Sequence, residues 1–189
     1  MTALRTFAGV HPIHHFQGAL FALRTDRDTV YMSEQCPAAG DDAWAVVEVD
    51  PDRFLKLWRQ LGSSHSEVAH QNPATWPQDP KFPWPDRHFA EGRANPVPLA
   101  TVGCELRRVQ TPVWRRRLLG KVLERVDVTG HPVLSFTDGV TRTIWLLTHG
   151  VKVMPVKCPE GEAALLQALA GVDGGQPVAV SALFNQKKG

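Results

Sequence analysis

The 189-residue sequence predicts an α+β fold. Three observations support this prediction: residues 1–49 form short apolar runs between turn residues, residues 95–189 alternate strand-like runs with helix-like spacing, and a proline-rich segment separates the two. A chain of this length buries a sizeable core without a disulfide or a metal. We therefore expect one compact unit made of a strand-rich part with one helix (residues 1–62), a connecting segment (63–94) and a core (95–189).

The first part reads as four strands separated by Gly18 and by polar turns. We interpret them as an antiparallel meander with strands at residues 6–10, 19–24, 29–33 and 43–49. Asp50 and Pro51 then supply an N-cap and a first-turn proline, and apolar residues recur at helical spacing up to Gly62. A helix that covers the meander is predicted there.

The connecting segment contains most of the seven prolines found between residues 63 and 98. Proline cannot donate the hydrogen bonds of a β-ladder and favours extended polyproline geometry. The segment also carries four large aromatic residues, Trp76, Phe82, Trp84 and Phe89, whose exposure to water would be unfavourable. We expect these residues to hold the segment against the domain, with recognition of a partner as the alternative.

The core begins with an expected strand at residues 97–103. Thr111 and Pro112 then resemble an N-cap and first-turn proline, so a helix is predicted over 111–119, with apolar residues on one side and arginines on the other. Beyond Gly120 either this helix continues or a strand at 122–128 pairs through Thr129-Gly130 with residues 132–136, and the strand is favoured. The remaining predicted elements are a strand at 133–137, a helix at 139–149, a strand at 151–156, a helix at 160–170 and a strand at 177–183.

The formal net charge of +2 conceals a strongly basic segment, because residues 105–125 hold seven cations and two anions. Such local density attracts phosphate or an acidic partner. The residues predicted to bind nucleic acid or a partner are Arg107, Arg108, Arg115, Arg116 and Arg117. A solvated helix face is the alternative interpretation.

The stretch Asp138-Gly-Val-Thr-Arg142 lies where a strand turns into a helix. We expect Asp138 to cap the helix, and Gly139 to leave room for a ligand at the free N–H groups of the first turn. Phosphate is predicted to bind at Gly139, Val140, Thr141 and Arg142, with Asp138 and Arg142 in catalytic roles. Alternatively, Asp138 only caps the helix and Arg142 pairs with a surface carboxylate.

The segment VLSFTDGVTRTIWLLTHGVKVMPV (133–156) resembles the motif of the ParB/sulfiredoxin superfamily, in which a strand ends in Asp-Gly-x-His-Arg, a helix runs to a glycine and a short strand closes with Pro-Val. The segment NPVPLATV (95–102) resembles the opening strand of that superfamily. In length and character the chain is similar to the plasmid fertility inhibition factors. The resemblance implies a ParB/sulfiredoxin-like mixed sheet with flanking helices over the core.

The resemblance further implies a bacterial cytoplasmic protein that blocks DNA transfer through a type IV secretion system at its coupling ATPase. It implies a hydrolase with ATPase and DNase activity, with ATP as substrate and with DNA and the coupling ATPase as partners. Mg²⁺ or another divalent cation is expected only together with a bound nucleotide or phosphodiester, with Asp138 or Glu105 as supporting carboxylate. Thr141 replaces the usual histidine, which keeps a phosphate donor and removes an imidazole. A non-catalytic module that binds the coupling protein or DNA through its arginine-rich surface is the alternative.

Other classes of function are disfavoured. Val140 stands where sulfiredoxins carry their reactive cysteine, and the 33 residues after the motif leave no room for the DNA-reading helices of partitioning ParB proteins. The three cysteines include no CxxC pair, so neither a disulfide framework nor a zinc site is indicated, and a reducing cytoplasm is expected. His11 and His15 would lie roughly 13 Å apart on a strand, too far for one metal ion.

We also expect no signal peptide and no membrane span, because no run approaches the ~18 apolar residues that a span requires. Any contact with the inner membrane would then come from recruitment to the secretion machinery.

Overall fold

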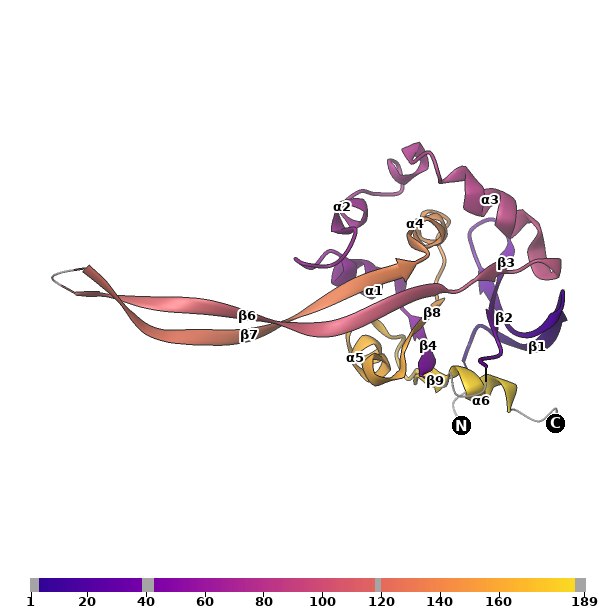
Figure 1. Ribbon diagram of the computed structural model, residues 1–189. Helices are drawn as coiled ribbons and strands as arrows, with labels where there is room; N and C mark the ends of the chain where they lie inside the picture. The colour runs from indigo at the N-terminus through magenta and orange to yellow at the C-terminus, as the bar shows by residue number, and fades with distance from the viewer. Residues whose placement is uncertain (1–3, 39–42, 118–119, 186–189) are drawn as a thin grey trace.

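The structure, a computed structural model, describes residues 4–38, 43–117 and 120–185 (Figure 1). It contains two β-sheets and flanking helices, which confirms the predicted α+β class. In the first sheet, β1 (Phe7–Ile13), β2 (Phe16–Arg24) and β3 (Thr29–Gln35) form an antiparallel meander, and β5 (Val97–Pro98) adds parallel to β3.

The second sheet is mixed and has the strand order β7-β6-β8-β4-β9. Its strands are β4 (Trp44–Val49), β6 (Ala100–Arg117), β7 (Gly120–Asp138), β8 (Met154–Pro159) and β9 (Val178–Ala179). The meander prediction is therefore wrong for its fourth strand, because β4 joins this sheet between β8 and β9. The run from Ala45 to Val49 is continuously buried, as expected for a central strand covered on both faces.

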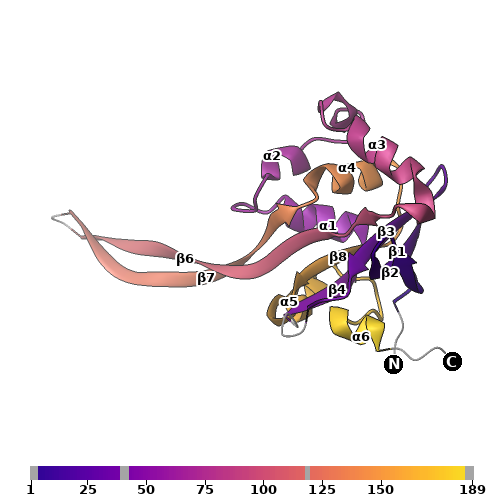
Figure 2. The same cartoon turned by 45° about the vertical axis from the view of Figure 1, so that its right-hand side comes forward.

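Helices α1 (Pro51–Trp58) and α5 (Glu160–Ala170) flank the second sheet, and α4 (Val140–Thr148) follows β7 directly (Figure 2). Asp50 caps α1 as predicted, since its Oδ1 accepts the Arg53 N–H at 2.9 Å. Buried side chains of both sheets, such as Met32 and Val156, belong to one hydrophobic core. No helix in the described part of the chain is long and apolar enough to cross a membrane.

The proline-rich segment folds into short helices, so the prediction of extended polyproline geometry is wrong. These are α2 (Ser66–Ala69), η1 (Trp76–Gln78), α3 (Pro83–Ala90) and η2 (Gly92–Ala94). Prolines occupy first-turn positions of η1 and α3, where their missing N–H is no loss. The predicted burial is confirmed for Trp76, Phe82 and Phe89 and is wrong for Trp84, which is 58% exposed.

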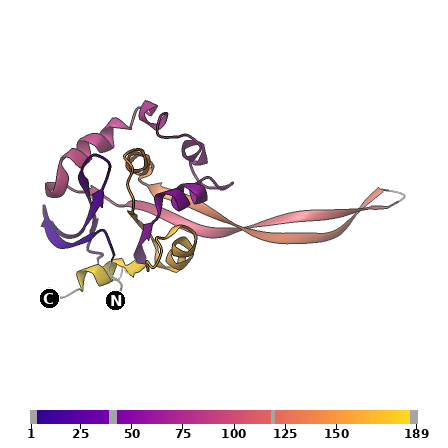
Figure 3. The ribbon, with the colours of Figure 1, turned by 180° about the vertical axis from the view of Figure 1, so that it is seen from behind.

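Strands β6 and β7 form one long antiparallel hairpin that projects from the body in every view (Figures 1–3). The predicted helix at 111–119 is therefore wrong. The strand favoured at 122–128 is confirmed, but its predicted pairing through Thr129-Gly130 is wrong, because β7 continues through both residues. Residues 118 and 119 lie outside the described part. We name residues 105–117 and 120–132 the hairpin arm.

The edge of β7 nearest the body is covered by the chain that follows α1. The Leu134 N–H donates to the Ser63 hydroxyl, the Phe136 N–H donates to the Ser64 hydroxyl, and the Ser64 N–H donates to the Leu134 carbonyl. At the C-terminus, the predicted strand at 177–183 is only the two-residue β9, because residues 180–184 form helix α6 (Val180–Phe184).

Candidate phosphate-binding pocket

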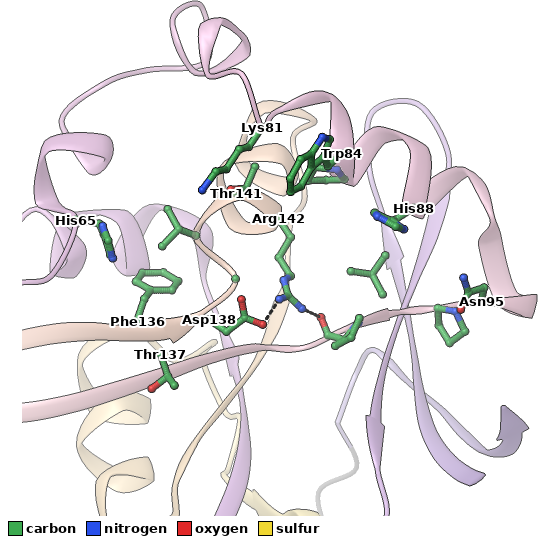
Figure 4. Close-up of a pocket in the computed structure, with 16 residues that line it drawn as sticks. His65, Lys81, Trp84, His88, Asn95, Phe136, Thr137, Asp138, Thr141 and Arg142 are labelled. Atoms are coloured by element: carbon green, nitrogen blue, oxygen red, sulfur yellow. Dashed lines mark hydrogen bonds and ion pairs between the residues drawn. The ribbon is translucent and has the colours of Figure 1, made fainter. Parts of the chain in front are cut away.

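A cavity of about 580 Å³ lies where the proline-rich segment faces the start of α4 and strand β5 (Figure 4). It brings together the predicted motif and residues more than forty positions earlier in the sequence. The polar or aromatic side chains that line it are His65, Lys81, Trp84, His88, Asn95, Phe136, Thr137, Asp138, Thr141 and Arg142.

The turn into α4 depends on Gly139. Its φ of 99° lies in the left-handed region that side chains rarely adopt. A Cβ at this position would lie 2.7 Å from the Ala100 Cβ and 2.8 Å from the Ala100 Cα. Gly139 therefore allows the end of β7 to cross close to β6 and turn at once into the helix.

Arg142 is held inside the protein by two elements. Its Nη2 donates to the Asp138 carboxylate, and its Nη1 donates to the Pro98 carbonyl at 2.7 Å (Figure 4). The Arg142 side chain is 14% exposed, whereas that of Asp138 is 67% exposed. The guanidinium thus ties the start of α4 to the end of β7 and to β5.

The prediction that Asp138 caps α4 is wrong. Gly139 is the N-cap residue and no side chain caps the helix. Asp138 instead neutralises Arg142, a cation near the helix N-terminus where the macrodipole disfavours positive charge. The alternative in which Arg142 pairs with a carboxylate is the one the structure supports, although both residues still border the cavity.

The helix start nevertheless faces the cavity. The first N–H groups of an α-helix have no partner within the helix, and residues 139–142 line the cavity wall. Thr141 is half-buried there and Val140 lies beside it. Backbone N–H groups and the Thr141 hydroxyl can therefore donate to an anion without any movement of Arg142.

Four of the cavity residues that sequence reasoning missed come from the proline-rich segment. Lys81, Trp84, His65 and His88 are exposed, and Figure 4 shows Lys81 and Trp84 on the side of Thr141. Lys81 supplies the positive charge that the paired Arg142 does not offer, and Trp84 supplies an uncovered aromatic face. The only sequence signal was the adjacency of a lysine to aromatics in KFPWP.

The arginines predicted to form one binding face are spread along the hairpin arm. Arg107 and Arg108 are neighbours on a strand and point to opposite faces. Arg115 is seven residues from Arg108, roughly 24 Å along an extended strand. The side chains of Arg116 and Arg117 lie outside the described part, so their binding role stays a prediction. None of the three arginines whose side chains the structure describes, Arg107, Arg108 and Arg115, lines the cavity.

The two buried cysteines are unsuited to thiolate chemistry. Burial raises the pKa of the Cys104 thiol to about 11 and that of Cys158 to about 12, and the nearby Glu162 carboxylate adds to both shifts. Only a small fraction of either thiol is ionised near neutral pH. This finding agrees with the exclusion of sulfiredoxin chemistry that was based on Val140.

The cavity offers little to a metal ion on its own. Asp138 is the only carboxylate among its lining residues, and Glu105, a second candidate carboxylate, pairs with Arg107 on the hairpin arm at 3.6 Å. Among the described residues no group of three or more His, Cys, Asp or Glu side chains is placed to hold a metal ion. The residues present do not fit a protein-only divalent site.

Comparisons with known proteins agree with this fold. A family model described as plasmid fertility inhibition factor matches residues 46–171. Protein osa from Shigella flexneri is 33% identical over 142 residues, which cover 75% of this chain and 62% of that protein. The structure also matches a crystal structure of an oncogenic suppression activity protein, described as a plasmid fertility inhibition factor, in a gold(I) cyanide derivative. The TM-score is 0.67 and the sequence identity is 29%. The match covers 94% of this chain and 80% of that chain.

Proposed function

Since the chain belongs to the plasmid fertility inhibition factors, we propose that it lowers plasmid DNA transfer through a type IV secretion system by acting at the coupling ATPase in the bacterial cytoplasm. We further propose that the cavity at the start of α4 binds the phosphates of ATP and of DNA and supports their hydrolysis.

The observation that carries the second proposal is the convergence on one cavity of donors from two distant segments. The free N–H groups of residues 140–142 and the Thr141 hydroxyl come from α4, and the Lys81 ammonium comes from the proline-rich segment. Together they suit a polyphosphate, because each donor can meet a different oxygen. Trp84 offers a face on which a nucleobase can stack.

In this proposal Arg142 is a positioning residue. Its bonds to Asp138 and to the Pro98 carbonyl fix the orientation of the first turn of α4. The donors then stabilise negative charge that develops on phosphate oxygens as water attacks. His65 and His88 border the cavity and can supply the imidazole that Thr141 lacks. A divalent cation would enter with the phosphates, held mainly by their oxygens and water.

The test compares Lys81→Ala and Thr141→Val with Lys152→Ala, an exposed lysine outside the cavity. Loss of one charge-assisted hydrogen bond costs about 1.5–3 kcal/mol. The first two variants should therefore bind ATP at least tenfold more weakly than wild type, and Lys152→Ala should bind it normally. Fluorescence titration, phosphate release and cleavage of plasmid DNA, each with and without EDTA, measure the outcome. Equal hydrolysis by all four proteins would refute the catalytic proposal.

A second candidate function is a non-catalytic module that binds the coupling ATPase or DNA. The engagement of Arg142 by Asp138 favours it, because the one arginine of the motif is already neutralised. Under this alternative, the Lys81→Ala and Thr141→Val variants inhibit plasmid transfer to the same degree as the wild type. The purified protein then releases no phosphate from ATP. A mating assay run beside the hydrolysis assay separates the two candidates.

A further inference from the structure

Among the described side chains of the hairpin arm, the exposed apolar ones lie mainly on one face. Side chains alternate between faces along a strand, and residues directly opposite each other share a face. The register places Leu106 opposite Pro132, Gln110 opposite Val128 and Pro112 opposite Val126, all on one face. Leu106 and Val128 are each 57% exposed, and Val126 is 45% exposed.

A β-bulge extends this arrangement toward the tip. The register shifts between Val113 and Trp114, where Glu124 is the extra residue of β7. Leu123 consequently returns to the face of Val126, although the two residues are three positions apart. It is 46% exposed. We name Leu106, Leu123, Val126 and Val128 the apolar stripe.

The opposite face of the hairpin arm is polar and largely neutralised by its own charges. Arg125 donates to Asp127 at 2.9 Å, and Arg107 lies 3.6 Å from Glu105. Val109, 41% exposed, is the large exposed apolar side chain described on this face. A phosphate backbone bound there would compete with these ion pairs.

The position of the apolar stripe suggests that another protein surface covers it. It continues the face of Cys104 and Leu134, which are buried in the core, into a region where no described element packs against it (Figures 1 and 3). A two-stranded ribbon is marginally stable in water when its apolar face is uncovered. Val128, Val126 and Leu123 follow one another along β7 on this face, and a row of exposed apolar side chains of this kind is typical of protein interfaces.

Charge identifies the kind of partner. The hairpin arm, with residues 118–119 between its strands, holds seven cations and three anions, so a second copy would bring like charge against like charge. Arg108 is exposed and projects from the striped face opposite Gly130, where there is no facing side chain. DNA would satisfy the cations but would leave the stripe against a polar, hydrated surface.

We propose that the hairpin arm docks through its apolar stripe into an apolar groove, bordered by carboxylates, on a partner protein. The stripe forms the buried centre of the interface, and Arg108 forms part of its charged rim. The inference rests on the proposed function only for the choice of the coupling ATPase as the probe.

The test uses the full chain with Val128→Lys, Val128→Asp and the matched control Val109→Lys on the opposite face. Binding to the purified soluble part of the coupling ATPase and plasmid transfer in a mating assay are both measured. Both Val128 variants should bind at least tenfold more weakly and lose inhibition of transfer, whereas Val109→Lys should bind within about twofold of wild type. Wild-type binding by both Val128 variants would overturn the proposal.

Two further measurements distinguish other occupants of the stripe. If the arm binds DNA, Val128→Lys should strengthen and Val128→Asp weaken binding to a DNA duplex, and transfer inhibition should follow that order. If a second copy covers the stripe, sedimentation should show a wild-type dimer that dissociates in both Val128 variants. Either result overturns the proposal of a partner protein.

Failure of the proposed function gives a different pattern. If the wild type does not bind the coupling ATPase or inhibit transfer, a photo-cross-linking amino acid is placed at position 128 or at position 109 in cells that carry the plasmid. Cross-links from position 128, and not from 109, to an identified acidic segment of another protein, whose purified form binds wild type and not Val128→Lys, support the docking face. Equal cross-linking from both positions, or none, overturns it.

Discussion

At the scale of single residues, two residues of the motif have structural roles, and these roles constrain any test of its chemistry. Gly139 gives the chain a left-handed turn against Ala100, and Arg142 binds Asp138 and the Pro98 carbonyl. Replacing either residue changes the shape of the cavity before it changes any contact with a ligand. Lys81 and Thr141 are therefore the better probes of function, because within the described part of the chain the side chain of neither makes an intramolecular hydrogen bond.

Gly139→Ala should lower the free energy of unfolding by about 3 kcal/mol, because left-handed strain adds to a clash with the Ala100 backbone. Gly92→Ala isolates the strain, since Gly92 has a φ of 64° and nothing within 4 Å of an added Cβ, and should cost about 1 kcal/mol. Gly161→Ala, with neither constraint, should be neutral or stabilising. Urea denaturation measures all three, and equal costs for Gly139 and Gly92 would contradict the clash.

Arg142→Ala should cost about 2 kcal/mol, because it leaves the Pro98 carbonyl and the Asp138 carboxylate without their charged donor. Arg125→Ala is the matched control: it also removes an arginine paired with an aspartate, but on the exposed hairpin arm, and should cost less than about 1 kcal/mol. Thermal unfolding of the two variants gives the comparison. Equal stability of both would mean that Arg142 does not fix the start of α4.

The buried thiols predict a loss of stability in alkali. Their folded pKa values, about 11 for Cys104 and about 12 for Cys158, lie above the unfolded value of 9.0. Above pH 9 the unfolded chain therefore releases protons that the folded chain keeps, so unfolding becomes easier as pH rises. Each thiol should remove roughly 2 kcal/mol between pH 9 and 11.

Denaturation of Cys104→Ala and Cys158→Ala at several pH values checks this sign. Each variant should lose stability less steeply than wild type above pH 9 and in parallel with it below pH 9. Cys36→Ala, which removes an exposed thiol, should keep the wild-type slope. A steeper slope in either core variant would contradict the assignment.

At the scale of elements, the hairpin arm is separable from the body. The hydrophobic core contains no described residue between Cys104 and Val133. Arg107 and His131 face each other across the ribbon, so a two-residue Asn-Gly turn can join them in place of residues 108–130. The arm is thus an appendage whose loss should not expose the core.

The chain with Asn-Gly in place of residues 108–130 should fold with a melting temperature within about 3 °C of wild type, because its core is intact. It should also fail to inhibit plasmid transfer, since the proposed docking face is gone. Circular dichroism and a mating assay check the two expectations separately. An unfolded product would show that the arm contributes to the stability of the body.

Local sequence signals identified the body better than they identified the arm. In the body, the Asp50 cap and the turn at Asp138-Gly139 correctly indicated a helix start and a strand-to-helix turn. In the arm, the alternation at 122–128 correctly indicated a strand. Thr111-Pro112 and the spacing of the apolar residues after it suggested a helix, but pairing with β7 along the whole length of β6 overrides that local preference.

For the candidate site, the sequence could indicate only residues that are adjacent in the chain. Residues 138–142 were found because they form one motif. Lys81 and Trp84 reach the same cavity from short helices in a segment that the prolines suggested would be extended, and no spacing rule links them to Thr141. Only the three-dimensional path of this segment past α4 shows that Lys81 and Trp84 lie at the same cavity as Thr141.

At the scale of the whole molecule, buried polar contacts join the two sheets. Glu48 of β4 is 2% exposed, and its Oε1 accepts the N–H and the hydroxyl of Thr6 at 2.6 and 2.7 Å, while its Oε2 accepts the Arg5 N–H at 2.8 Å. Lys157 of β8 pairs with Glu34 of β3 at 3.0 Å. These contacts fix the meander against the second sheet in addition to the shared core.

Glu48→Ala should cost about 3 kcal/mol, because it leaves the two buried donors of Thr6 and the part-buried Arg5 N–H without an acceptor. Thr6→Val removes one hydroxyl from the same contact and should cost about 1 kcal/mol. Hydrogen exchange at residues 5–7 should rise in the first variant more than in the second. Equal protection in both would show that the core alone holds the meander in place.

In the hairpin arm, strands β6 and β7 pair with each other, and no described arm residue belongs to the core. The length of the arm can therefore change without changes in the body. Removing one facing pair of residues near the tip shortens the ribbon by roughly 3.4 Å, and removing two pairs shortens it by about 7 Å while returning every remaining side chain to its original face. The same scaffold can therefore be fitted to targets whose distance from the α4 cavity differs, in steps set by the rise of a β-strand.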